Sequence, residues 1–235
     1  GIKKGLVIIN AETGGWVDPD QVKMIIQQTG LENWELCENI PDEHEIREKL
    51  FNFMDEVKEN NRALIIPVDQ YFNVKGVGLV AIGYVQSGSV SKHDNIQVLP
   101  VGENGIVRSL QVMDDDVEIA LSGDRVGLAI RNLREEALHR GCMVTHLDSE
   151  ALVKNISSTF EIKKAPFQKR ELEIGDVIHA AVDMQFIVGR VSNKESTNFT
   201  VEWEVPLWTR LIDSPPIIIT QLDATPMRII GTTIF

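Results

Sequence analysis

Residues 64–144 contain a series of short alternating strand patterns separated by turns, and this feature constrains the fold more than any other. Residues 64–69 follow a period of two, glycines mark a turn at 76–78, and a second strand pattern runs over 79–85. Turn residues recur about every 8–12 positions along the stretch, as in small all-β domains. This spacing predicts a small antiparallel barrel.

Residues 1–60 follow a different pattern, in which apolar runs alternate with helical segments. The continuous apolar run at 6–9 is typical of a strand buried on both faces of a parallel sheet. Asp18 and Pro19 provide an N-cap and a first-turn proline, and Asp42 begins a second helix. Strand, helix, strand, helix is half of a doubly wound sheet. Two parallel strands are few for an independent domain, so we expect the remnant of a larger one.

A second all-β region follows a linker at 145–156, with prolines such as Pro206 interrupting its strands. The expected fold class is therefore multidomain α/β plus all-β: a partial doubly wound α/β remnant followed by two antiparallel β-barrels. The expected boundaries are 1–60 for the remnant, 63–148 for the first barrel and 155–235 for the second.

The composition limits the partners of the chain. A formal net charge of −12 over 235 residues argues against loose electrostatic binding to nucleic acid, which depends on Lys and Arg meeting phosphates; we expect no DNA partner. The acidity is concentrated in the first two thirds, so the last third can still present a basic face. No apolar run approaches the ~20 residues of a membrane span and no signal peptide opens the chain. We expect a cytoplasmic protein with no membrane partner.

The sequence offers no metal site. Cys37 and Cys142 lie in apolar strand contexts and are expected to be buried free thiols. The histidines show no metal-ligand spacing, and three consecutive aspartates at 114–116 alternate in direction, which predicts a solvated loop rather than convergent ligands. Because the chain begins at Gly1 rather than Met, we expect a processed product or a fragment.

Ordered motifs within the first barrel carry a family resemblance. They are Pro-Val-Asp at 67–69, Gly-x-Gly at 76–78, Gly-Asp-Arg-Val-Gly at 123–127 and Arg-Gly-x-x-Val at 140–144. In this order they resemble the second domain of translational elongation factors of the Tu type.

The third domain narrows the resemblance. Residues 175–191 and 218–231 resemble the selenocysteine-specific, SelB-like branch. The whole chain is similar to archaeal members with a truncated or degenerate GTPase domain.

The resemblance implies a translation elongation factor module that binds aminoacyl-tRNA or the ribosome. It implies that the aminoacylated end of the tRNA meets Asp69, Gln111 and Arg125 on the first barrel. It also implies that the second barrel contacts the tRNA backbone through Lys163, Lys164, Lys169 and Arg170. The alternatives are ordinary turn and strand residues in the first set and a solvated loop in the second.

The family uses GTP and Mg²⁺, but this chain lacks the parts that hold them. No Gly-x-x-x-x-Gly-Lys-[Ser/Thr] run is present in the 235 residues, and that loop is what cradles the phosphates. Where the guanine-binding Asn-Lys-x-Asp motif is expected, Asn10 matches but Thr13 replaces the aspartate, and a hydroxyl cannot form the charge-assisted bond of a carboxylate. We expect no cofactor and no GTPase activity. The alternatives are a C-terminal fragment of an active translational GTPase and a non-RNA interaction scaffold.

Overall fold

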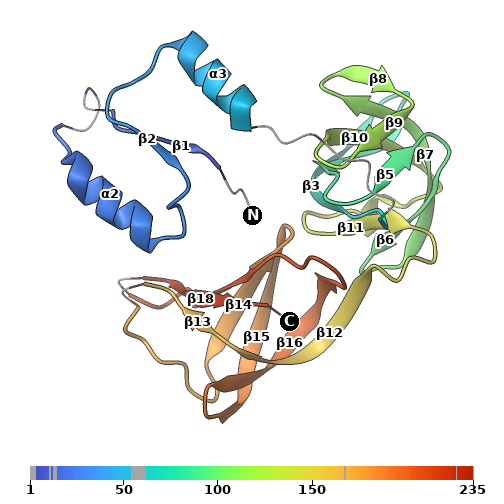
Figure 1. Ribbon diagram of the computed structural model, residues 1–235. Coiled ribbons are helices and arrows are strands. Elements are labelled where there is room, and N and C mark those ends of the chain that lie inside the picture. Colours follow the sequence, from blue (N-terminus) through green and yellow to red (C-terminus); the bar gives the residue numbers. More distant parts are fainter. Residues whose placement is uncertain are drawn as a thin grey trace. The chain divides into compact units, whose positions relative to one another are not determined.

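The computed structural model describes residues 4–10, 12, 15–53, 62–166, 168–225 and 227–234. The chain divides into two compact units, Gly1–Val57 and Lys58–Phe235. The first unit is a small α/β region, and the second contains two seven-stranded β-sheets and a two-stranded ribbon (Figure 1).

The α/β unit has two parallel strands, β1 (Leu6–Ile8) and β2 (Glu35–Cys37), which pair from Leu6 opposite Glu35. The helix α2 (Pro19–Gln28) follows β1, and α3 (Glu43–Phe53) follows β2. This order confirms the predicted strand–helix–strand–helix pattern.

Both predicted helix starts are confirmed by their hydrogen bonds. The Asp18 carboxylate accepts from the backbone N–H of Asp20 at 3.0 Å, and Pro19 occupies the first turn of α2. The Asp42 carboxylate accepts from the N–H of Glu45 at 2.8 Å. These bonds satisfy N–H groups that have no partner inside the helix.

The α/β unit buries little apolar surface. Among its described residues only Ile9 and Ile26 are buried apolar side chains, and α3 buries none. Leu50 and Phe51 of α3 are instead 50% and 63% exposed. The described part of this unit therefore has a much smaller apolar core than an independent domain of ordinary size.

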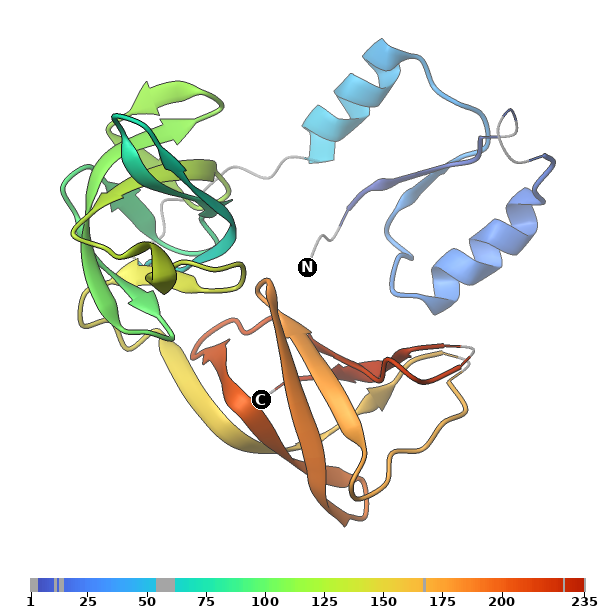
Figure 2. The ribbon, with the colours of Figure 1, turned by 180° about the vertical axis from the view of Figure 1, so that it is seen from behind.

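The first sheet of the second unit is a closed barrel of six strands (Figure 2). Its order is β10-β4-β3-β11-β6-β7, and a pairing between β10 and β7 closes the ring, while β8 pairs with β7 outside it. A separate two-stranded ribbon joins β5 to β9. The elements are β3 (Ile66–Val74), β4 (Gly78–Tyr84), β5 (Ser89–Ser91), β6 (Asn95–Leu99), β7 (Glu103–Val112), β8 (Asp115–Val117), β9 (Ile119–Leu121), β10 (Arg125–Arg131), the 3-10 turn η1 (Glu135–Ala137) and β11 (Met143–His146).

Alternation along the strands fills the barrel. The side chains of Leu110 on β7 and of Val126 and Leu128 on β10 are fully buried. The alternate positions on these strands, Gln111 and Gly127, face outwards. Gly83 is required where β4 crosses β3 closely, because a Cβ there would lie 2.3 Å from the carbonyl oxygen of Pro67. The period of two in the sequence is therefore the pattern of a barrel wall.

The second sheet is curled into a half-barrel of seven strands, in the order β12-β16-β15-β14-β17-β18-β13. Its two end strands are consecutive in the chain, separated only by Ile162. The predicted fold class is confirmed, with the second barrel formed as this curled sheet. Its strands are β12 (Leu152–Glu161), β13 (Lys163–Lys164), β14 (Val177–Val182), β15 (Gln185–Glu195), β16 (Asn198–Arg210), β17 (Ile217–Thr220) and β18 (Ile229–Thr233).

A buried ion pair anchors one turn of this sheet. Asp183 and Met184 form the tight turn between β14 and β15 with φ of 46° and 64°. The Arg210 Nε donates to the Asp183 carboxylate at 2.9 Å, and a second guanidinium nitrogen bonds its other oxygen. The two side chains are only 10% and 6% exposed.

The two cysteines differ in burial. Both are free. Cys142 is fully buried, as expected from the sequence, and burial raises the pKa of its thiol to about 11. Cys37 is only half-buried, because β2 is covered by so small a core; full burial was expected there. In the described part of the chain, no helix is long and apolar enough to cross a membrane.

Candidate functional site

Four neighbouring strands of the first barrel form an outer face that contains two of the predicted site residues. Gln111 of β7 lies opposite Gly127 of β10, Gly127 lies opposite Ile82 of β4, and Ile82 lies opposite Gln70 of β3. Directly paired residues of antiparallel strands point to the same side. Because the alternate positions are buried, this row faces outwards.

Arg125 belongs to the same face. It lies two residues before Gly127 on β10, so both residues are on one side of the strand. Gln111 is directly opposite Gly127, which makes Arg125 its diagonal neighbour, about 7–8 Å away in a regular sheet. Arg125 is exposed. The fold thus brings Gln111 and Arg125 together on one face.

Gly127 leaves the surface between these two side chains bare. A Cβ placed on it would meet nothing nearer than the carbonyl oxygen of Gln111, at 4.0 Å. A glycine inside a strand often marks a position where a ligand or another backbone approaches closely. The sequence showed Gly127 only as the end of a turn motif; its position inside an alternating strand was the signal that could have identified it.

Aromatic side chains border the same face. Tyr84 lies opposite Arg125, and Phe72 lies opposite Val80 on the next outward row. Both rings are 42% exposed. The face therefore combines a cation, an amide and accessible aromatic surface around Gly127, where the strand carries no side chain.

Asp116 contacts Gln111 from the strand on its other side. The Gln111 Nε2 donates to the Asp116 Oδ1 at 3.1 Å, and the two residues are directly opposite in the β7–β8 pairing. The aspartates at 114–116 are all exposed, as expected of a solvated segment. However, only Asp114 lies in the turn; Asp115 begins β8. The described residues contain no group of three or more His, Cys, Asp or Glu side chains that could hold a metal ion.

Asp69 has a different neighbour. It is the extra residue of a bulge in β3, where the register shifts between Val68 and Gln70. Its carboxylate lies 3.5 Å from the Arg140 guanidinium, with side-chain exposures of 25% and 70%. The ion pair found for Asp69 is thus with Arg140, not with Arg125.

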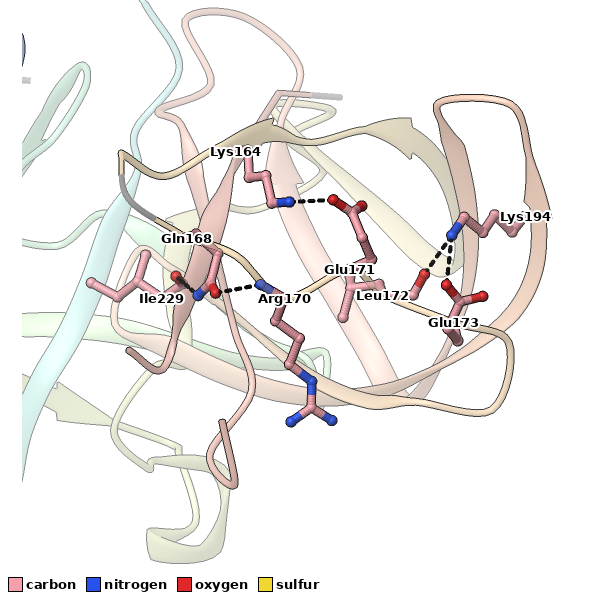
Figure 3. Close-up of polar contacts among 8 residues, drawn as sticks. All are labelled: Lys164, Gln168, Arg170, Glu171, Leu172, Glu173, Lys194 and Ile229. Carbon is pink, nitrogen blue, oxygen red and sulfur yellow. Dashed lines mark hydrogen bonds and ion pairs between the residues drawn. The ribbon is translucent and has the colours of Figure 1, made fainter. Parts of the chain in front are cut away.

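The predicted basic cluster of the second sheet is partly neutralised. Lys164 pairs with Glu171 (Figure 3), and this hydrogen bond lowers the pKa of the Glu171 carboxyl. The Arg170 guanidinium lies 4.0 Å from Asp176 and 3.9 Å from Asp223.

Two of the four basic residues keep their charge available. Lys163 and Lys169 are exposed, and no ion pair to a described residue is found for either. The free positive charge of the cluster is therefore about half of what the sequence indicated.

Hydrogen bonds fix the segment that carries this cluster (Figure 3). The Gln168 amide donates to the carbonyl of Ile229 at 2.8 Å, and its oxygen accepts from the N–H of Arg170 at 2.9 Å. The Lys194 ammonium donates to the carbonyl of Leu172 at 2.8 Å. Lys163 and Lys164 thus form β13, and hydrogen bonds hold the described residues around Lys169 and Arg170 in place after it.

The degenerate guanine motif follows β1. The Asn10 side-chain oxygen accepts from the N–H of Glu12 at 3.0 Å, so it caps its own backbone. Thr13 lies outside the described residues.

Comparison with known proteins gives consistent matches. Residues 78–145 match the family described as elongation factor Tu domain 2. An uncharacterized protein of Methanocaldococcus jannaschii is 33% identical over 207 residues, which cover 87% of this chain and 64% of that protein. The selenocysteine-specific elongation factor of the same organism is 32% identical over 161 residues, covering 64% of this chain and 34% of the factor. The chain spans less than two thirds of the length of these relatives.

The fold also matches a solved structure. Translation elongation factor SelB from Methanococcus maripaludis, in its apo form, aligns over 97% of this chain and 56% of its own, with a TM-score of 0.75 and 23% identity. At that identity the likeness concerns the fold alone. An alignment of this extent includes the α/β unit as well as the two sheets.

Proposed function

Because residues 78–145 belong to the elongation factor Tu domain 2 family, we propose that this chain is a SelB-like translation elongation factor module that binds aminoacyl-tRNA. The 32% identity to a selenocysteine-specific elongation factor supports this assignment over a longer part of the chain. The partner we infer is the aminoacylated end of a tRNA. The alternatives are a chain that binds only the ribosome and a scaffold that binds a protein. The tRNA-binding test described below distinguishes both from the proposed function.

The observation that carries this proposal is the outer face around Gly127. Arg125 supplies a cation, Gln111 supplies an amide, and Gly127 leaves room for a flat group to lie against the strand. Tyr84 and Phe72 add exposed aromatic surface, on which bases stack favourably. A nucleoside that carries an ester needs this combination of apolar surface and a few polar groups.

The second sheet is proposed to hold the tRNA backbone through Lys163 and Lys169. Lys164 and Arg170 contribute less, since neighbouring carboxylates already compensate their charges. Contacts of this kind position the RNA without selecting its sequence.

Replacing Arg125 by alanine tests the proposal. We expect binding of charged tRNA to weaken roughly ten- to a hundredfold, because a hydrogen bond to a charged group contributes about 1.5–3 kcal/mol. Uncharged tRNA should bind almost as before. Filter binding with both forms at one fixed salt concentration measures this.

Arg47→Ala is the matched control. It removes the same charge from α3, where the arginine side chain is 66% exposed, and should change neither affinity. Equal losses for charged and uncharged tRNA in Arg125→Ala would assign the arginine to backbone contact only. Equal, weak binding of both forms by the unaltered chain would exclude the proposed function.

We further propose that this chain is not a GTPase. Phosphoryl transfer in this class needs a phosphate loop with its lysine, a bound Mg²⁺ and a positioned water, and the sequence contains no such loop. We expect no change in melting temperature with millimolar GTP and Mg²⁺. A ligand at a hundred times its Kd would stabilise by about 2.7 kcal/mol, a shift of several degrees. A shift with GTP but not with ATP would contradict the proposal.

A further inference from the structure

We propose that Asp116 is a positioning residue, which orients the Gln111 amide so that the outer face of the barrel presents a hydrogen-bond acceptor to its ligand. This inference rests on the proposed function, because Gln111 lies within the site proposed for the tRNA end. Asp116 itself was expected to belong only to a solvated acidic segment.

The geometry allows one orientation of the amide. An ionised carboxylate has only acceptor atoms, so the Gln111 NH₂ group must face Asp116, as the 3.1 Å contact between Nε2 and Oδ1 shows. With Nε2 held by Asp116 of β8, the amide oxygen remains to accept from a ligand on the face that Gln111 shares with Gly127 of β10. Among the described residues no donor to this oxygen is found.

Of the three aspartates at 114–116, Asp116 is the one placed to orient the Gln111 amide. Asp115 lies opposite Val112, on the other side of the sheet, and Asp114 is in the turn with φ of 69°. A neutral glutamine also suits the position better than a glutamate, because like charges directly opposite each other destabilise a strand pair. Gln111 and Asp116 thus form a matched cross-strand pair.

A fixed acceptor selects the chemistry of the ligand. A glutamine amide that rotates freely can present either its oxygen or its NH₂ group to a ligand, whereas this one keeps its NH₂ group on Asp116 and leaves its oxygen to accept from a donor. The terminal adenosine of a tRNA offers two donors of this kind, the exocyclic N6 amine and a ribose hydroxyl. We infer that the Gln111 oxygen accepts from one of them.

The first test needs no RNA. The side-chain amide signals of Gln111, identified by their loss in Gln111→Glu, are compared between the unaltered chain, Asp116→Ala and Asp115→Ala in ¹⁵N–¹H spectra. We expect Asp116→Ala to shift these signals and Asp115→Ala to leave them unchanged. Asp116→Asn, which keeps an acceptor oxygen, should restore most of the original position.

The second test measures discrimination. Aminoacylated tRNA with its normal terminal adenosine is compared with tRNA ending in purine riboside, which lacks the N6 amine, and with tRNA ending in 2′-deoxyadenosine. We expect the unaltered chain to prefer the normal end at least about tenfold over one of the two, which corresponds to about 1.4 kcal/mol. Asp116→Ala should reduce this preference to about twofold, and Asp115→Ala should keep it.

Two results would overturn the inference. Unchanged amide signals in Asp116→Ala would mean that Asp116 does not orient Gln111. Equal binding of all three ends by the unaltered chain would mean that the Gln111 oxygen meets no donor, and the proposed function would stand if charged tRNA still binds more tightly than uncharged. If the unaltered chain binds no charged tRNA, the proposed function fails together with the ligand assignment, while the amide signals still decide the role of Asp116.

Discussion

Replacing Asp183 by alanine is expected to lower the free energy of unfolding by about 3–5 kcal/mol. The Arg210 guanidinium is 10% exposed and bonds both carboxylate oxygens of Asp183. Without the carboxylate a positive charge would remain buried and unpaired, and its one other side-chain hydrogen bond, to the neutral Gln86 amide oxygen at 3.3 Å, does not offset that desolvation cost. The turn between β14 and β15 would also lose its anchor.

Urea denaturation followed by tryptophan fluorescence measures this change, since Trp203 and Trp208 both lie in the second sheet. Asp223→Ala is the matched control: that side chain is 76% exposed, and the loss should stay within about 0.5 kcal/mol. Adding Arg210→Met to Asp183→Ala should recover part of the stability, because it removes the unpaired charge. A loss no larger than that of the control would show that the pair is not effectively buried.

Gly127→Val is expected to reduce the affinity for charged tRNA at least about a hundredfold while leaving the barrel folded. The new side chain would stand on the outer face, where a Cβ meets nothing nearer than 4.0 Å, and valine is favoured in strands. A bulky group that occupies the ligand's place removes its apolar contacts and its hydrogen bonds together, at about 1.4 kcal/mol for each tenfold loss. Filter binding and the melting temperature, measured on the same sample, separate the two effects.

Asn104→Val provides the comparison for this variant. It adds a valine to an exposed position of the same strand as Gln111, seven residues away, which is roughly 23 Å along a strand. We expect it to bind charged tRNA normally. If Gly127→Val also binds normally and melts at the same temperature, the aminoacylated end does not lie on this face.

The fold could be predicted from the sequence because it depends on local alternation. A period of two, with turns at regular intervals, is sufficient to indicate an antiparallel barrel wall. The closure of the ring by β10 and β7 was not visible, because it depends on register between separate strands. The same reason applies to the second sheet, where β12 and β13, separated only by Ile162, occupy opposite ends.

The candidate site could be predicted only in part. Gln111 and Arg125 were placed by resemblance, and their adjacency follows from a strand pairing that no single segment encodes. The partners of the other charged residues lie far away in the chain: Asp69 meets Arg140, and Arg170 meets Asp223. An estimate of available charge from composition treats these residues as unpaired. In the fold, each of them has an oppositely charged neighbour.

The placement of β12 and β13 at opposite ends of the second sheet also determines when this sheet can assemble. β12 and β13 leave the site of synthesis early, but their partners β16 and β18 come near the end of the described chain. Until then β12 exposes unpaired backbone groups, which favour pairing with other chains. Pairings between such distant segments also form slowly. The order of synthesis therefore makes this sheet the last of the described sheets to become protected, and the one most exposed to aggregation if synthesis stops before β18.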